Sequence, residues 1–235
     1  MPNSNALRYR YLLFDVDNTL LDFSAGERAA LFQTMEQIGL PISEPDYQTY
    51  VEINQSVWTK FEAGLLDSKA VQRLRFEEFA SYLNRDPAEG PALNDRYVEN
   101  LGRQAVLLDG SLDALQKLSA CYRLAVVTNG LTLVQRERLK RSGFLPYLSG
   151  VFISQEMGVQ KPSKEYFDFV LGALGDPGRE RCLVIGDSLS ADIQGGVNAG
   201  IDTCWFRKDD SPQSVSDLPT YTVYGYAELL RLLLP

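Results

Sequence analysis

The sequence predicts an α/β fold, in which a doubly wound, Rossmann-like parallel sheet carries an inserted helical segment. Short apolar runs recur along the chain, and each is followed directly by a polar or glycine-containing turn and a helix-like pattern. A long stretch after the first run has helical periodicity and no convincing strand. Polar clusters follow three of the runs, at the carboxyl ends of strands where such sheets bind ligands.

The strands of the expected sheet are continuous apolar runs, as is typical of strands that are covered on both faces. In chain order, these runs are residues 9–14, 124–128, 150–154, 182–185 and 202–206. Because helical patterns alternate with them, we expect right-handed crossovers that join them into one parallel sheet. The apolar residues 226–233 predict a last helix that packs on this sheet.

The stretch after the first strand predicts a separate helical domain. Apolar residues recur at helical spacing over 27–38 and 68–83, and prolines and glycines punctuate the stretch. We therefore expect residues 1–21 and 106–235 to form the α/β core domain. Residues 22–105 are expected to form a helical lid over the edge of the sheet where ligands bind.

Charge and composition exclude several classes of protein. The chain has 235 residues, a net charge of −8 and no histidine. The negative charge disfavours binding to a nucleic acid polymer, whereas a small anionic substrate is possible because a metal and a few cations can reverse the sign locally. The lack of histidine excludes Ser-His-Asp and Cys-His catalysis and histidine metal ligands.

The cysteines and the apolar runs indicate a compartment. Three cysteines without a CxxC pair argue against a disulfide framework and a thiolate zinc site. Cys121 and Cys182 begin apolar runs, which predicts small core or near-core residues. No apolar run approaches the roughly 20 residues that span a bilayer, and the first ten residues lack a signal-peptide pattern. We therefore expect a cytoplasmic protein that does not contact a membrane.

Two carboxylates, Asp15 and Asp17, follow the first predicted strand. Positions two apart in an extended strand point to the same side, and two like charges so placed attract a divalent cation or move their pKa values apart. One carboxylate could then attack phosphorus while the other handles the proton of the leaving group. Taken alone, the pair is also compatible with an ordinary polar turn.

The longer sequence of residues 14–22, Phe-Asp-Val-Asp-Asn-Thr-Leu-Leu-Asp, resembles the first signature of the haloacid dehalogenase superfamily. The second signature, a strand ending in Thr or Ser, matches Thr128 with Asn129 and Gly130; its alternative is an ordinary helix cap. The third, a lysine ahead of a helix, matches Lys161 before Pro162, although a lone lysine is usually a solvated surface group.

The fourth signature, an acidic pair after a strand, matches Asp187 and Asp192. The resemblance implies that Asp187 completes a Mg²⁺ shell with Asp15 and the backbone carbonyl of Asp17, which are hard oxygen ligands. It implies that Asp192 supports the site by orienting Lys161 or the metal shell, with helix capping as the alternative. It also makes residues 22–105 a C1-type cap.

The resemblance implies a mechanism. Asp15 attacks phosphorus in line, and Asp17 protonates the leaving oxygen and then activates water against the acyl phosphate. Thr128, Asn129 and Lys161 hold the transferring phosphoryl group, while Mg²⁺ neutralises the developing charge.

Among branches of the superfamily, Asp17 argues against a dehalogenase, because its relatives that cleave carbon–halogen bonds lack an acid at this position. The core motifs together with residues 186–195 and 198–205 resemble the YjjG/YfnB group of bacterial pyrimidine 5′-nucleotidases, with a departure from the pattern at Gly196 and Val197. This implies a nucleoside monophosphate as the substrate. A phosphatase for another small metabolite, such as phosphoglycolate or a sugar phosphate, is the main alternative, followed by a phosphomutase and a non-catalytic binding protein.

Specificity in this resemblance rests on the cap. Four residues of this region are candidates for touching a base or sugar, and an aromatic side chain among them could stack on a base: Phe23, Trp58, Lys60 and Phe61. The alternative, that Trp58 and Phe61 simply form the core of the cap, is favoured.

Overall fold

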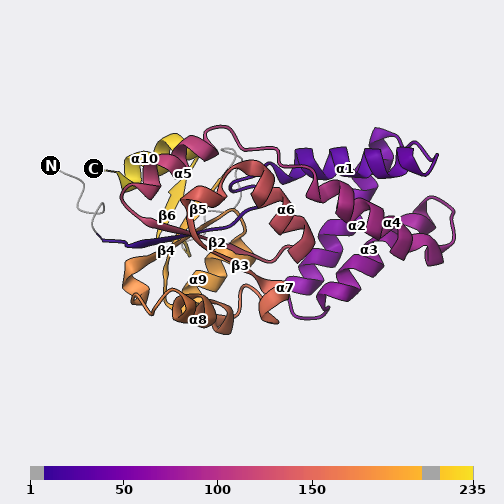
Figure 1. The fold of residues 1–235 in the computed structure, drawn as a ribbon. Helices are drawn as coiled ribbons and strands as arrows, with labels where there is room; N and C mark the ends of the chain where they lie inside the picture. Colours follow the sequence, from indigo (N-terminus) through magenta and orange to yellow (C-terminus); the bar gives the residue numbers. More distant parts are fainter. Residues whose placement is uncertain (1–7, 208–217, 235) are drawn as a thin grey trace. The chain divides into compact units, whose positions relative to one another are not determined.

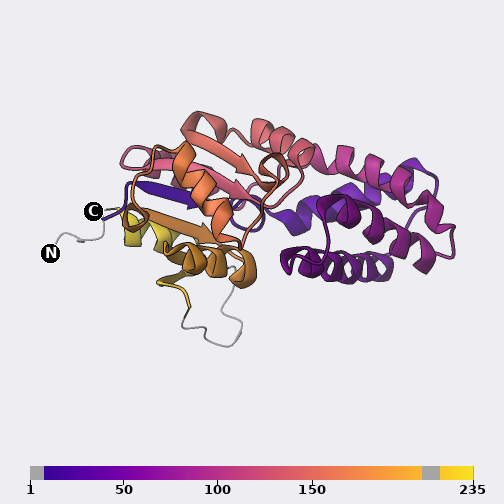
Figure 2. The same cartoon turned by 90° about the horizontal axis from the view of Figure 1, so that it is seen from below.

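The computed structural model describes residues 8–207 and 218–234 and contains a six-stranded parallel sheet. The strand order is β3-β2-β1-β4-β5-β6, and Figure 2 shows the arrows running in one direction. The strands are β1 (Tyr11–Phe14), β2 (Arg123–Thr128), β3 (Leu148–Ile153), β4 (Cys182–Gly186), β5 (Asp202–Phe206) and β6 (Tyr221–Val223). The predicted doubly wound α/β fold is therefore confirmed.

Five of the strands coincide with the predicted apolar runs, and the sixth was not predicted. β6 is only three residues long and pairs with β5 as the edge strand of the sheet, where Cys204 lies opposite Tyr221. A strand of this length carries too few residues for an alternating or continuous apolar pattern to be recognised. Its place is fixed by pairing with β5, which no local pattern encodes.

Helices cover both faces of the sheet (Figure 1). On one face, alternate residues of the strands, such as Leu13, Val127 and Val184, pack against α8 (Lys164–Ala173) and α9 (Gln194–Ala199). The opposite face carries α5 (Ser111–Ser119) and the predicted last helix α10 (Tyr226–Leu233). Period-two alternation thus sends successive strand side chains into two separate apolar layers.

The other elements between β2 and β5 are short or lie in the connections. They are η3 (Leu145–Tyr147), α7 (Ser154–Met157), η4 (Arg179–Arg181), the π-helical turn η5 (Leu189–Ile193) and α6 (Thr132–Ser142). The π-helical turn begins directly after β4 and its loop, at the end of the sheet where the acidic residues gather. Such turns are rare and frequently occur at functional sites.

The chain forms two compact units. Of the described residues, the first unit holds 8–23, 106–132, 142–207 and 218–234, and the second holds 24–105 and 133–141. The second unit contains most of α1 (Phe23–Gln37), together with α2 (Glu44–Glu62), α3 (Ser68–Tyr82), η2 (Pro87–Glu89) and α4 (Gly90–Gly102). The division at 22 and 105 into a core domain and a cap domain stays a prediction.

Polar side chains cap the N-termini of two helices in the second unit. Ser43 and Asp46 form a capping box at the start of α2, and Asp67 accepts from the N–H of Ala70 at the start of α3. Inside the unit, Tyr50 packs against Phe76 and Tyr97 with ring centroids 5.4 and 5.7 Å apart. The unit therefore has an aromatic core of its own.

The cysteines are all free, and their positions correct one expectation. Cys182 and Cys204 are buried in β4 and β5, whereas Cys121 is exposed. Cys121 lies in the turn between α5 and β2, so its side chain precedes the apolar strand instead of belonging to it. In the described ranges, none of the helices combines the length and the apolar character that crossing a bilayer demands.

Candidate active site

The predicted acidic residues lie at the carboxyl end of the sheet, directly after its two central strands, β1 and β4. Asp15 follows β1 and Asp187 follows β4, and the N–H of Asp15 continues the ladder by donating to the carbonyl of Ile185 at 2.8 Å. The order of the sheet reverses at this pair, since the chain adds β2 and β3 on one side of β1 and then β4 on the other. This is the switch point where doubly wound sheets bind ligands.

Lys161 joins the acidic residues through a buried ammonium group. Its Nζ donates to Asp15 Oδ1 at 2.8 Å, to Asp192 Oδ1 at 2.6 Å and to the carbonyl of Val127 at 2.9 Å. The Lys161 and Asp192 side chains are only 2% and 1% exposed. Lys161 is therefore not the solvated surface group that a lone lysine usually is, because all three donors of its ammonium are used inside the fold.

The charges in this cluster shift the pKa values of its members. Burial, followed by the charges of Asp192 and Asp17, raises the pKa of Asp15 to about 7, although Lys161 lowers it. Burial and the nearby Asp15 also raise the pKa of Asp187 well above its usual value. Burial alone would lower the pKa of Lys161, but the Asp15 and Asp192 carboxylates raise it, so the ammonium stays charged.

Asp192 is held on both carboxylate oxygens. While Oδ1 accepts from Lys161, Oδ2 accepts from the backbone N–H of Ser188 at 3.1 Å. The turn requires glycine at position 186, since a Cβ there would lie 2.2 Å from Asp192 Oδ2. Asp192 therefore both contacts Lys161 and closes the turn after β4, and its supporting role in the site stays a prediction.

Asn129 and Thr128 follow β2 at the same end of the sheet. The Asn129 amide makes two hydrogen bonds with the main chain of Lys161, one in each direction, both at 2.9 Å. The Thr128 side chain is buried, and its hydroxyl accepts from the N–H of Gly130 at 3.1 Å. That these two residues hold a phosphoryl group stays a prediction.

Asp17 lies in the tight turn after β1 and is half-buried. Asn18 adopts a left-handed conformation with φ 57°, and the N–H groups of Leu20 and Leu21 both donate to the carbonyl of Val16. The charge of Asp17 raises the pKa values of Asp15 and Asp187, so it acts on both carboxylates. That Asp17 transfers the proton of the leaving group stays a prediction.

Three contacts at the site were not predicted from the sequence. The Trp205 indole donates to the carbonyl of Asp187 at 2.8 Å, and Asn198 Nδ2 donates to the carbonyl of Pro162 at 3.0 Å. The Tyr226 hydroxyl donates to the carbonyl of Thr19. Each side chain reaches a main-chain group far away in the sequence, so no local spacing could have identified it.

The aromatic candidates in the second unit pack together. Phe61 is 3% exposed, and its ring meets Trp58 edge to face with centroids 5.3 Å apart. Both pack with Val57 and Val71 in one apolar cluster of the unit. This is the alternative that the sequence favoured for these residues. Lys60 is exposed.

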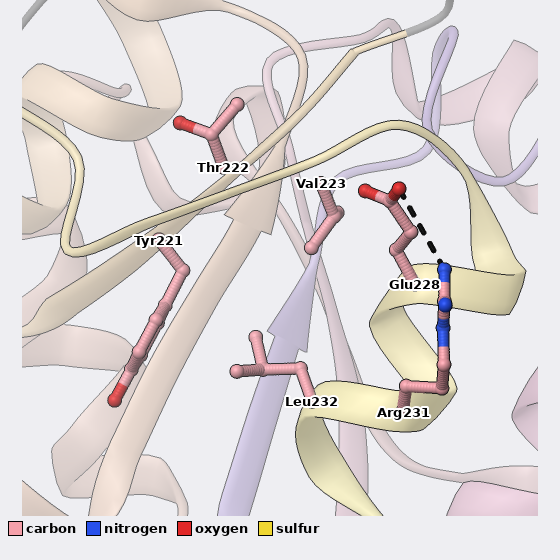
Figure 3. Close-up of a pocket in the computed structure, with 6 residues that line it drawn as sticks. All are labelled: Tyr221, Thr222, Val223, Glu228, Arg231 and Leu232. Carbon is pink, nitrogen blue, oxygen red and sulfur yellow. Dashed lines mark ion pairs between the residues drawn. The ribbon is translucent and has the colours of Figure 1, made fainter.

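A groove at the other edge of the sheet is unrelated to the acidic residues. It lies between β6 and α10 and is lined by Tyr221, Thr222, Val223, Glu228, Arg231 and Leu232 (Figure 3). Its charged members, Glu228 and Arg231, form an ion pair at 3.7 Å that neutralises them mutually. None of the predicted site residues lines this groove.

The acidic cluster has the chemistry of a divalent cation site. One carboxylate oxygen each from Asp15, Asp187 and Asp192 lies within 4.8 Å of the others. Both oxygens of Asp192 already accept hydrogen bonds, which leaves Asp15 and Asp187 as the better candidates for ligands. Hard oxygen donors fit Mg²⁺, and a cation would offset the burial and the repulsion between carboxylates that together raise the pKa values of these two groups.

Comparison with known proteins gives a consistent result. Residues 9–200 match the family model of the haloacid dehalogenase-like hydrolases. The chain is 38% identical over 226 residues to the pyrimidine 5′-nucleotidase PynA of Streptococcus pneumoniae, covering 96% of this chain and 95% of PynA. It is 32% identical over 227 residues to the pyrimidine 5′-nucleotidase YjjG of Escherichia coli, covering 97% and 99%. A crystal structure of YfnB from Bacillus subtilis, described as bound to magnesium, has a TM-score of 0.91 at 38% identity and covers 97% and 100%.

Proposed function

Since this chain belongs to the haloacid dehalogenase-like hydrolase family, we propose that it is a Mg²⁺-dependent phosphomonoester hydrolase that forms an aspartyl-phosphate on Asp15. We further propose that its substrates are pyrimidine nucleoside 5′-monophosphates. The observation that carries the chemistry is the buried Lys161 ammonium, 2.8 Å from Asp15 and 2.6 Å from Asp192. It supplies a fixed positive charge beside the carboxylate that would attack.

In the first step, an Asp15 carboxylate oxygen forms a bond to phosphorus while the bond to the substrate's ester oxygen breaks. The Asp17 carboxyl group gives its proton to that leaving oxygen, which departs as the alcohol of the nucleoside. The second step reverses the proton transfer. Water attacks phosphorus and gives a proton to Asp17, which releases inorganic phosphate and restores the Asp15 carboxylate.

Lys161 is suited to stabilising the charge of the transferring phosphoryl group. The neighbouring carboxylates raise its pKa, so it carries a positive charge throughout the reaction. Its three hydrogen bonds also fix the direction of the ammonium before the substrate binds. Because this order exists in the free protein, little reorganisation is needed when charge develops in the transition state.

Asp15 and Asp187, with the backbone carbonyl of Asp17, are the groups that would hold Mg²⁺. When bound, the ion would neutralise the negative charge that accumulates between the nucleophile and the phosphoryl oxygens. The chain brings only oxygen donors to this place in its described part, which suits Mg²⁺ better than a softer metal. The magnesium in the similar YfnB crystal structure supports this choice.

The substrate class rests on the relatives and not on the catalytic residues. PynA and YjjG, both pyrimidine 5′-nucleotidases, match this chain over nearly its full length. The core residues Asp15, Asp17 and Lys161 would serve any phosphomonoester equally well. We therefore assign selection of the substrate's organic part to the helical segment 22–105, as the resemblance implies for a cap.

Phosphate release with Mg²⁺, and with EDTA as the control, tests the proposal across nucleoside 5′-monophosphates and small sugar phosphates. We expect metal-dependent release that favours dUMP, dTMP or UMP, and a loss of at least about a thousandfold in Asp15→Asn. Metal-dependent release favouring a sugar phosphate would retain the roles of Asp15 and Lys161 and reject the nucleotidase assignment. Near-full activity of a folded Asp15→Asn protein would reject the covalent mechanism.

A further inference from the structure

We propose that Trp205 is a positioning residue of this site: its indole N–H holds the main chain of Asp187 so that the Asp187 side chain faces Asp15. The inference rests on the proposed function, in which Asp187 is a metal ligand. Trp205 lies in β5, pairs in register with Gly186 at the end of β4, and is 4% exposed. Its Nε1 donates to the carbonyl oxygen of Asp187 at 2.8 Å.

The contact falls where the sheet stops supplying hydrogen bonds. β4 ends at Gly186, so the carbonyl of Asp187 is the first one beyond the strand. This carbonyl is partly withdrawn from solvent, where a missing partner costs free energy, and the indole N–H provides the partner. Tryptophan has a single donor and no acceptor, so this bond uses all of the hydrogen-bonding capacity of the side chain.

The other end of the same peptide group is also held. Ser188 contributes the N–H of this group, which donates to Asp192 Oδ2 at 3.1 Å, while the carbonyl of Asp187 receives Trp205. Because a peptide group is planar, fixing its C=O and its N–H fixes the orientation of the whole plane. This restrains rotation about the Cα–C bond of Asp187, on which the direction of its Cα–Cβ bond depends.

Asp187 needs such a restraint because its neighbours repel it. Its carboxylate lies within 4.8 Å of carboxylate oxygens of Asp15 and Asp192. Like charges at this distance favour a conformation in which the side chain turns away. A main chain fixed by Trp205 opposes this turn, and it keeps the oxygens of Asp15 and Asp187 close before a cation arrives. Loss of such support for a ligand typically weakens metal binding by about 10–100-fold.

The ring of Trp205 is itself fixed. The guanidinium of Arg207 lies over it, with the central carbon 4.6 Å from the ring centroid. A phenylalanine at position 205 would keep an aromatic ring in this place and remove the indole donor together with part of the buried ring volume. Trp58, the other tryptophan of the chain, packs in the apolar cluster with Phe61 and Val57 and provides the matched control.

The test is calorimetric titration of Mg²⁺ into the wild type, Trp205→Phe and Trp58→Phe, with turnover measured at saturating Mg²⁺. We expect Trp205→Phe to bind Mg²⁺ about tenfold more weakly, while its kcat at saturating Mg²⁺ falls by a smaller factor. Trp58→Phe should bind Mg²⁺ as the wild type does. A folded Trp205→Phe whose Mg²⁺ affinity is within about twofold of the wild type would overturn the inference and leave the proposed function intact.

A second measurement does not depend on the folding of the Trp205 variant. The two indole N–H resonances of the ¹⁵N-labelled wild type can be assigned with Trp58→Phe and followed during addition of Mg²⁺. We expect the Trp205 resonance to shift and the Trp58 resonance to stay. A Trp205 resonance that is indifferent to bound Mg²⁺ would overturn the inference. A wild type that binds no Mg²⁺ at all would overturn the proposed function as well.

Discussion

Asn129 and Lys161 hold each other through two reciprocal hydrogen bonds, each 2.9 Å long. The N–H of Lys161 donates to Asn129 Oδ1, and Asn129 Nδ2 donates to the carbonyl of Lys161. The side-chain amide therefore mimics the edge of a neighbouring strand and fixes the main chain from which the ammonium extends. This relationship connects the end of β2 to the loop before α8.

The first prediction concerns this pair. Asn129→Ala removes both bonds and loosens the main chain from which the Lys161 ammonium extends, so we expect kcat to fall about 10–100-fold with a smaller change in KM. Asn129→Asp keeps the acceptor and loses the donor, and it should show an intermediate loss. Steady-state kinetics with a nucleoside monophosphate measure both. If Asn129→Ala raises KM and leaves kcat unchanged, Asn129 binds substrate in the ground state instead.

The second prediction concerns the buried charge of Lys161. Lys161→Met leaves Asp15 and Asp192 facing each other without a cation, and removing one partner of a buried pair costs about 3–5 kcal/mol. We expect activity to disappear and the free energy of unfolding to fall by this order in urea denaturation.

Lys164 offers the matched control for that variant. Its Nζ lies 2.5 Å from Asp168, but its side chain is 53% exposed. Lys164→Met should therefore change the free energy of unfolding by less than about 1 kcal/mol. Equal stability of the Lys161 and Lys164 variants would contradict the burial and pairing of the Lys161 ammonium.

The third prediction concerns the close approach of Gly186 and Asp192. Gly186→Ala places a methyl group 2.2 Å from Asp192 Oδ2, so the turn after β4 must shift. We expect lower stability and weaker Mg²⁺ binding, measured by denaturation and calorimetry. Gly172→Ala is the control, because a methyl group at this position in the last turn of α8 would point into open space and alanine favours helices by about 0.5–1 kcal/mol. A Gly186→Ala protein that matches the wild type in both measurements would contradict the packing.

The fourth prediction concerns the thiols. Burial raises the pKa of Cys182 and Cys204 to about 12, whereas Cys121 is exposed. At pH 8 a thiol reagent such as DTNB should react quickly with one thiol in the folded protein and with three after unfolding. Cys121→Ser should abolish the fast reaction. Rapid modification of two or more thiols without unfolding would contradict the burial of β4 and β5.

The same two thiols give a dependence of stability on pH. Their pKa values are higher in the folded protein than the value of about 8.5 in an unfolded chain, so the folded state binds these protons more tightly. Their contribution to stability is therefore complete below about pH 8.5 and is lost as the pH rises through about 12. Serine at both positions should weaken this alkaline dependence in denaturation curves measured across that range.

Much of the fold follows from local sequence pattern. The apolar runs predict β1 to β5, and the acidic residues after β1 and β4 meet because neighbouring parallel strands end at the same edge. The helix of residues 226–233 is also predicted by its apolar stripe. These features depend only on the period of a short segment and on the rules for parallel sheets.

The supporting contacts could not be predicted in this way. Trp205 contacts a carbonyl 18 residues away in the sequence, and Tyr226 contacts one 207 residues away. Asparagine commonly caps helices, but the Asn129 amide forms hydrogen bonds with the main chain of Lys161 instead. Such bonds depend on which main-chain groups the finished sheet leaves without partners, and that is a property of the whole fold.

The covalent intermediate on Asp15 is the central claim, and trapping it during turnover tests the claim most directly. Protein mixed with dUMP and Mg²⁺ is quenched, an acyl phosphate is reduced with borohydride, and the modified residue is located by peptide mass spectrometry. We expect homoserine at position 15, and none when EDTA replaces Mg²⁺ or when Asp15 is replaced by Asn. Steady phosphate release with Asp15 unmodified at every quench time, or with the modification at another residue, would contradict the mechanism.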